Sequence, residues 1–307
     1  MKAKGYFYGC LSSATYGLIP LFTLPMMAKG MVFDSILFYR FLCATIAIGC
    51  LMAFRGESFR VEKKAIMPLV VLGILFAFSA LFLFWSYTFM AAGIASTILF
   101  LYPVFVTLLM AFMFHEKVSW ITQFAIGLAF VGVALLYKGD VGEALNPVGV
   151  IIVLLSSLSY ATYIIMVNKS AVQGISGSKL TFYAMLVSAC FFFVKAQTNG
   201  GLQSLPDWET VMNILLLAIV PTVVSCISMV YSVHYIGSTS TAVLGAMEPV
   251  TAVCVGALVF GEPFTSNLAI GILLIIMSVT LIILSKNIMR NLSSIHHRVA
   301  IHLFKKG

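Results

Sequence analysis

Leu244–Thr265 has the sequence LGAMEPVTAVCVGALVFGEPFT, an apolar stretch that ends in a short polar turn containing Glu262. It approaches the ~20 residues that cross a bilayer as a helix. One carboxylate, Glu248, lies inside the stretch, directly before Pro249. A charge inside an apolar span is costly, so Glu248 is the first candidate for a functional residue.

An earlier stretch, Phe100–Ser119, repeats this pattern as FLYPVFVTLLMAFMFHEKVS. Its Pro103 and Glu116 each precede the corresponding proline and glutamate of the later stretch by 146 positions. Tyr102 stands where the later copy has Glu248. The proline and the closing glutamate are therefore shared features, whereas Glu248 distinguishes the second copy.

The composition indicates a membrane protein that crosses the bilayer many times. Hydrophobic residues make up 61% of the 307 positions and charged residues 9%, with a mean hydropathy of +1.08. A soluble domain carries roughly 25% charged residues. The net charge of +8 does not indicate a nucleic-acid partner, because the basic residues lie at the ends of the apolar segments.

The apolar segments number ten, each near the length that spans a bilayer. They cover approximately residues 4–26, 34–54, 65–89, 94–114, 120–138, 147–168, 179–198, 210–235, 239–260 and 266–286. The loops between them are short, so consecutive spans are expected to run antiparallel. All six cysteines fall within these segments, which predicts no disulfide framework.

The lysines and arginines predict the orientation. With the N-terminus in the cytoplasm, the cytoplasmic segments hold 14 of them, the external segments 3, and Arg40 lies within a span, which accounts for all 18. Both termini are therefore expected in the cytoplasm.

The two halves of the chain repeat each other. Leu11–Tyr16 matches Leu155–Tyr160, and Phe38-Tyr39 matches Phe182-Tyr183, both 144 positions apart. Five spans is an odd number, so the second half enters the membrane inverted. The sequence predicts an all-α membrane protein of ten transmembrane helices in two inverted five-helix repeats, residues 1–142 and 143–286. A basic amphipathic cytoplasmic tail is expected over 287–307.

With these features the chain resembles the EamA-type ten-span members of the drug/metabolite transporter superfamily. The resemblance rests on the two halves, the paired prolines, the acidic turns and Tyr39-Arg40-Phe41 early in the second span. His115 precedes Glu116 where the family usually has glycine. The resemblance implies a carrier in the cytoplasmic membrane, often an exporter of amino acids or other small metabolites.

Glu248 and Arg40 are the charged candidates for substrate binding. Glu248 suits an ammonium group or a proton, and Arg40 suits a carboxylate. The alternative is a buried ion pair between them that fixes helix packing. Tyr102 occupies the place of Glu248 in the other repeat and is expected beside the same cavity.

Hydroxyl groups at helical spacing form a second set of candidates. Ser12 and Tyr16 are four residues apart, as are Ser156 and Tyr160, and Tyr163 continues the second face. They line a cavity or, alternatively, hold helices together.

Aromatic and proline residues complete the candidates. Trp85 in the third span, equivalent to Tyr231, is expected to form a platform for an ammonium group or to pack against lipid. Pro103, Pro249 and Pro20 interrupt their spans and are predicted to form bends that gate the cavity.

These features favour a secondary transporter that works by alternating access, not an enzyme. His115-Glu116-Lys117-Val118-Ser119 lacks the second histidine of a zinc-protease motif. No cofactor or metal is expected, since His296, His297 and His302 have no cysteine or carboxylate cluster near them.

An amino acid or similar zwitterion is the first expectation for the substrate, and a lipophilic drug cation, exported in exchange for protons, is the second. The expected partners are the substrate, the bilayer and protons as coupling ion, without nucleic acid, and a monomer suffices.

Overall fold

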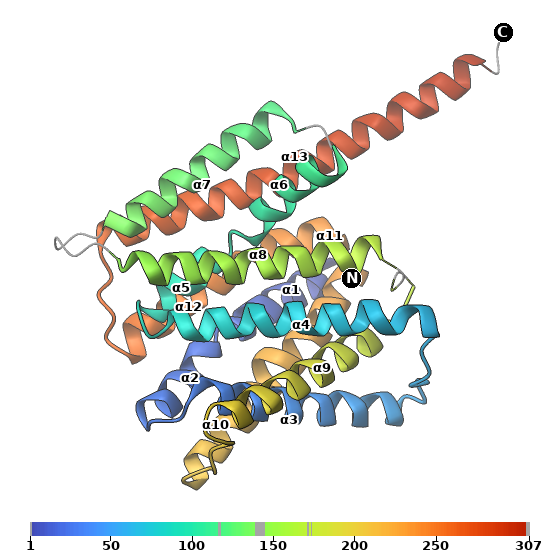
Figure 1. Ribbon diagram of the computed structural model, residues 1–307. Coiled ribbons are helices and arrows are strands. Elements are labelled where there is room, and N and C mark those ends of the chain that lie inside the picture. The colour runs from blue at the N-terminus through green and yellow to red at the C-terminus, as the bar shows by residue number, and fades with distance from the viewer. Residues whose placement is uncertain (1, 116–117, 139–144, 171, 173, 305–307) are drawn as a thin grey trace.

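The structure, a computed structural model, describes residues 2–115, 118–138, 145–170, 172 and 174–304, with side chains described up to residue 285 except at 137, 138, 168, 169, 238 and 239. The regular elements in these residues are helices, and most run roughly alongside one another in a bundle (Figure 1). The amphipathic surface predicted for the tail falls on side chains outside the described residues.

The helices follow the predicted apolar segments closely. Within the described residues, nine are long and apolar enough to cross a membrane, and a tenth apolar helix, Trp120–Leu136, is shorter. The elements are α1 (Lys2–Tyr16), α2 (Ile19–Ala28), α3 (Phe33–Phe54), α4 (Lys63–Ser86), α5 (Ala92–Leu99), α6 (Tyr102–Phe114), α7 (Trp120–Lys138), α8 (Pro147–Lys169), α9 (Gly177–Thr198), α10 (Trp208–Ala218), the π-helix η1 (Ile219–Val224), α11 (Ser225–Leu244), α12 (Met247–Val259) and α13 (Ser266–Phe304).

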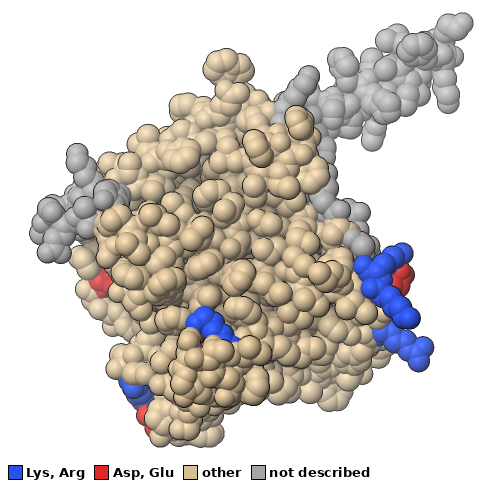
Figure 2. Space-filling model, viewed as in Figure 1, with Lys and Arg blue, Asp and Glu red and all other residues tan. Residues whose placement is uncertain are grey.

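The described surface in view is largely uncharged, as a lipid-facing surface requires (Figure 2). Large apolar side chains such as Phe112, Trp120 and Leu258 are each at least 84% exposed. In water these would be a liability, whereas in a bilayer they contact acyl chains. The chain is therefore a multi-pass membrane protein.

Three spans are interrupted near a proline. α1 gives way to α2 just before Pro20, α5 to α6 just before Pro103, and α11 to α12 just before Pro249. Proline has no N–H to donate and fits the first turn of a helix, so each helix restarts at that point. The sequence predicted bends, and the structure has complete breaks in the helices.

Serine pairs join the helices in the same way in both halves. The Ser12 hydroxyl of α1 donates to the Ser225 carbonyl of α11 at 2.8 Å, and Ser225 donates back to the Ser12 carbonyl at 2.9 Å. In the other half, the Ser156 hydroxyl of α8 donates to the Ser79 carbonyl of α4 at 2.6 Å. Ser12 and Ser156 are 144 positions apart and Ser79 and Ser225 are 146 apart, so the two contacts are equivalent.

Two tyrosines repeat this equivalence at opposite ends of α3 and α9. The Tyr39 hydroxyl donates to the Gln203 carbonyl at 2.9 Å, and the Tyr183 hydroxyl donates to the Phe59 carbonyl at 2.6 Å. Both members of each pair are 144 positions from their equivalents. The repeat seen in the sequence is therefore present in the tertiary contacts.

α7 and α13 pack closely because glycines meet between them. A Cβ added at Gly132 would lie 3.0 Å from the Gly271 carbonyl oxygen, and one added at Gly271 would lie 3.0 Å from the Gly132 carbonyl oxygen. Small residues allow this approach of two backbones within a membrane.

Candidate functional site

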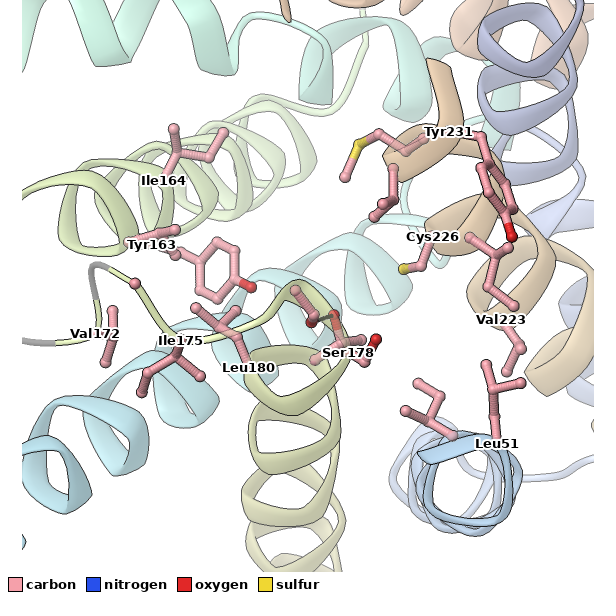
Figure 3. A pocket seen from close by; sticks show the side chains of 18 of the residues that line it. Leu51, Tyr163, Ile164, Val172, Ile175, Ser178, Leu180, Val223, Cys226 and Tyr231 are labelled. Atoms are coloured by element: carbon pink, nitrogen blue, oxygen red, sulfur yellow. Dashed lines mark hydrogen bonds between the residues drawn. The ribbon is translucent and has the colours of Figure 1, made fainter. Parts of the chain in front are cut away.

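A cavity of about 550 Å³ lies between α3, α8, α9 and α11 (Figure 3). At one end of the bundle the cavity is lined by residues near the end of α3 and the start of α9: Leu51, Arg55, Gly174 and Ser178. We call this end of the cavity the mouth. Among the described residues that line the cavity, Arg55 is the only charged one, and most of the others are apolar or aromatic.

Tyrosines surround the inner part of the cavity. Tyr163 of α8 and Tyr231 of α11 lie on different walls of it (Figure 3). Deeper, Tyr102 at the start of α6 meets Tyr160 of α8 edge-on, with ring centroids 4.8 Å apart. Tyr160 in turn stacks on Tyr163 at 5.8 Å.

Glu248 lies next to this cluster, in the first turn of α12. Its side chain is partly exposed. Its carboxylate lies within electrostatic range of four tyrosines, Tyr16, Tyr87, Tyr102 and Tyr160, but Glu248 is not among the residues that line the cavity. The position at a helix N-terminus favours a negative charge. Among the described residues no cation lies within ion-pair distance of the carboxylate, so it is available to a cationic ligand.

Arg40 has a different environment. It is 2% exposed, and its guanidinium carbon lies 5.4 and 5.8 Å from the centres of the Phe41 and Phe84 rings. Its Nε donates to the Thr222 hydroxyl of η1 at 3.4 Å, and its Nη2 has no partner among the described residues. Arg40 lines a void of about 10 Å³ with Tyr16, not the main cavity.

The alternative of a structural ion pair between Arg40 and Glu248 is therefore wrong for this conformation. Their side chains are not within 4.0 Å of each other. Tyr16 interacts electrostatically with both charges and lines the same small void as Arg40. The π-helix around Pro221 brings Thr222 towards Arg40, and such π-helical segments are frequent at functional sites.

Ser12 and Ser156 do not line the cavity. Both are at most 5% exposed, and their hydroxyls are engaged between helices. The packing role left open by the sequence is the one that the contacts support. Trp85 is 40% exposed, lies 6.4 Å from the Phe89 ring and is also absent from the cavity wall, unlike its equivalent Tyr231.

An ionic cluster around a buried carboxylate, at the other end of α3, was not foreseen from the sequence. Lys195 of α9 donates to the two carboxylate oxygens of Asp34 at 2.8 and 2.6 Å, and Asn199 donates to the same carboxylate at 2.9 Å. The Asp34 side chain is 3% exposed. We call these three residues the clamp. A lysine three residues inside the predicted end of an apolar segment is the signal that could have revealed it.

A second, exposed ion-pair group lies at the same end. Lys29 donates to Asp207 at 2.9 Å and to Glu209 at 2.7 Å. The hydrogen bond from Lys29 and those from Thr210 lower the pKa of Asp207 to about 2. These contacts join the α2 end to the start of α10.

The shared glutamate of the polar turn has a structural role. Glu262 accepts hydrogen bonds from the backbone of Ala92 at 2.9 Å and Gly93 at 3.4 Å, which caps the N-terminus of α5. Its equivalent, Glu116, lies outside the described residues.

The described residues contain no group of three or more His, Cys, Asp or Glu side chains that could hold a metal ion. His296, His297 and His302 have side chains outside the described residues.

Comparisons with known proteins agree with this architecture. The model of the EamA-like transporter family matches residues 3–138 and again residues 147–284. A Synechocystis protein described as an uncharacterized transporter is 25% identical over 228 residues, covering 72% of this chain and 68% of its own length. An uncharacterized transporter of Archaeoglobus fulgidus is 24% identical over 230 residues, covering 73% and 80%.

One solved crystal structure has the same fold, with a TM-score of 0.65 at 16% identity over 95% of this chain and 99% of that one. The twofold family match covers most of the sequence and explains the repeated contacts. The chain therefore belongs to the EamA-like transporter family of the drug/metabolite transporter superfamily, and it is a membrane transporter and not an enzyme.

Proposed function

We propose that the chain is a secondary transporter that works by alternating access between two inverted halves, with both termini in the cytoplasm. The excess of Lys and Arg in the segments on the N-terminal side supports this orientation. It puts the cavity mouth on the cytoplasmic face and the clamp on the external face. The structure then corresponds to an inward-open state of a carrier in the cytoplasmic membrane.

The observation that carries this proposal is that the mouth and the clamp occupy equivalent positions. Each pair is 144 positions apart: Leu51 with Lys195, Arg55 with Asn199, and Ser178 with Asp34. The same helices therefore end in an open mouth on one side and an ion pair on the other. An inverted repeat allows the two ends to exchange these roles.

The remaining cavity wall shows the same contrast. Ile48, Thr181 and Val230 line the cavity. Their equivalents at the other end are Phe192, Leu37 and Phe84, each 0% exposed. The region equivalent to the cavity at the other end of the bundle is therefore filled by packed side chains. In the outward-open state we expect Trp85 to line the cavity as Tyr231 does here, and the helix breaks before Pro20, Pro103 and Pro249 to act as hinges of the gate.

The substrate that we propose carries an ammonium group and is exported from the cytoplasm. The support for it is the Glu248 carboxylate, which has no cationic partner among the described residues and lies within electrostatic range of Tyr102 and Tyr160. A carboxylate and aromatic faces both attract an ammonium group. Amino acids and similar zwitterions share this group with organic cations, and Glu248 can also exchange a proton in either case.

One observation favours the organic cation over the zwitterion. A zwitterion needs a cation for its carboxylate, and Arg40 is buried behind Phe41 and Phe84. Arg55 follows the last residue of α3 and lies at the mouth of the cavity, not in the tyrosine cluster. An amine with an apolar body therefore fits this conformation better than an amino acid.

Matched pairs of substrates test the proposal. Tryptamine and tryptophan, and phenethylamine and phenylalanine, differ only by the carboxylate. We expect the amines to compete for uptake into inside-out proteoliposomes at lower concentrations than the amino acids. Preference for the amino acids would show that Arg40 reaches the substrate, and no saturable flux of any amine or amino acid would contradict the substrate class.

A further inference from the structure

A second cavity, of about 500 Å³, lies beside the mouth of the first. The two cavities share Gly174 and Ile175 as a common wall. Its other lining residues come from the start of α4, the segment before it and the start of α9. They are Arg60, Val61, Glu62, Lys64, Ala65, Ser176 and Lys179.

Three cations and one carboxylate line this cavity. Lys64 pairs with Glu62 at 2.8 Å, but both side chains are more than 70% exposed, so the pair contributes little and can exchange. Lys179 donates one hydrogen bond, to the Arg60 carbonyl at 3.0 Å, and an ammonium group has three donors. The Arg60 guanidinium has no hydrogen-bond or ion-pair partner among the described residues. Positive donors therefore remain available.

The repeat shows that the fold does not require these charges. At the equivalent positions of the other half, 144 residues away, Arg60 becomes Ser204, Lys64 becomes Trp208 and Lys179 becomes Ser35. Arg60 and Lys64 come from the segment before α4 and from its first turn, Lys179 comes from the start of α9, and all three line one cavity.

The position of the cavity suits a lipid headgroup. Ile66 and Met67, in the first turn of α4 beyond the cavity, are 52% and 69% exposed. Phe59, before it, is 39% exposed. Apolar side chains therefore begin directly beside the cationic cavity, as they would where a headgroup and its acyl chains contact one protein surface. Arginine and lysine together are the usual ligands of a phosphate group.

We propose that Arg60, Lys64 and Lys179 form a binding site for a phosphate-bearing anion, the headgroup of an anionic phospholipid, at the edge of the transport cavity. A bound phosphate would bridge the segment before α4 and the start of α9, which form part of the mouth. Such basic sites on the cytoplasmic side recognise anionic headgroups. The side of the membrane rests on the proposed topology, whereas binding itself does not depend on it.

Native mass spectrometry of the detergent-solubilised full chain tests this site. Phosphatidylglycerol and phosphatidylcholine with the same acyl chains are titrated separately. The variant Arg60→Gln with Lys64→Gln removes two cations and keeps the Lys179 hydrogen bond. The control, Lys2→Gln with Lys4→Gln, removes two cations from the exposed start of α1.

We expect phosphatidylglycerol to bind at least tenfold more tightly than phosphatidylcholine. The variant should weaken phosphatidylglycerol binding about 25-fold, which is about fivefold for each cation, and the control less than twofold. Equal loss in variant and control, or no preference for phosphatidylglycerol, would overturn the proposal.

Competition with inorganic phosphate distinguishes a site that recognises free phosphate from one that requires the phospholipid. If millimolar phosphate displaces the first bound phosphatidylglycerol from the wild type but does nothing further to the variant, the site recognises the free phosphate group. If phosphate does not compete, and the variant still loses phosphatidylglycerol, the site requires the intact lipid. Both results retain the site, and neither depends on whether the chain transports amines.

Discussion

The two ends of α3 and α9 have equivalent sequences and opposite structures. At one end Leu51, Arg55 and Ser178 surround an open mouth, whereas at the other Asp34, Lys195 and Asn199 hold the helices together. The two halves therefore share their helix–helix contacts, whereas the residues at the two ends of the bundle differ in chemistry. One gate closes with a buried ion pair, and the equivalent positions at the other offer no such pair.

The largest effect is expected where the halves differ most, at Glu248 and its equivalent Tyr102. Glu248→Gln keeps the size of the side chain and removes its charge. A hydrogen bond to a charged group contributes about 1.5–3 kcal/mol, so amine flux should fall about 10- to 150-fold. Flux into proteoliposomes measures the loss, and Tyr102→Phe, which removes a neutral hydroxyl, is the matched control with a smaller effect. Wild-type flux in Glu248→Gln would exclude this residue from the transport step.

The next effect concerns the clamp. Asp34→Asn leaves Lys195 without its charged partner and should favour opening at that end. Breaking a fully buried pair costs about 3–5 kcal/mol. Lys195 is 26% exposed, so we expect about 2 kcal/mol, or a thirtyfold shift towards the outward-open state.

Spin-label distances across the external ends of α3 and α9 report this shift. Ser178→Ala, at the equivalent position of the open mouth, serves as the control and should leave the distances unchanged. Identical distance distributions in Asp34→Asn and the wild type would show that the clamp does not hold the gate.

A smaller effect is expected at the turns that follow α6 and α12. His115 follows α6 with φ 53° and ψ 32°, and its equivalent, Gly261, has φ +66°. A left-handed conformation strains a residue that has a Cβ. His115→Gly should therefore stabilise the protein by about 0.5–1 kcal/mol, and Gly261→Ala should destabilise it by about 1–2 kcal/mol. Thermal unfolding in detergent measures both, and a decrease in stability for His115→Gly would contradict the prediction.

The smallest effect concerns the exposed group of Lys29, Asp207 and Glu209. The pKa of Asp207 lies below its usual range, at about 2, because Lys29 and Thr210 donate to it, and Glu209 and Asp207 raise the pKa of Lys29. The contribution of Asp207 to stability is therefore present above its unfolded pKa of about 4 and is lost as pH falls towards 2.

The difference in Tm between the wild type and Asp207→Asn should be constant between pH 5 and 8, shrink as the pH falls below about 4 and disappear near pH 2. A difference that changes between pH 5 and 8 would show that another group titrates at this end.

Much of the fold is predictable from the sequence because apolar length and a repeat are local signals. The segment boundaries, the pairing of Phe38-Tyr39 with Phe182-Tyr183 and the family followed from them. The prediction of a special role for Glu248 rests on its difference from Tyr102, and it stays a prediction.

Side-chain environment was less predictable. Arg40 and Glu248 are both charged residues within apolar spans, but the sequence does not reveal that Arg40 is buried against Phe41 and Phe84. Ser12 and Ser156 occupy equivalent positions in the two repeats, and their hydroxyls join helices. A repeated serine in the sequence does not distinguish helix packing from substrate binding. The sequence does not reveal the clamp, because Lys195 lies near the end of an apolar segment, where basic residues are common.

Alternating access is tested most directly by thiol labelling at Cys226 and Ala80. Cys226 lines the cavity, and its equivalent, Ala80, 146 positions earlier, is 8% exposed. In chains that keep one cysteine, a charged methanethiosulfonate should label Cys226 from the cytoplasmic face at least tenfold faster than it labels Ala80→Cys from the external face. Adding Asp34→Asn should reverse this order. Equal labelling from both faces, unchanged by Asp34→Asn, would contradict the exchange of roles between the two ends.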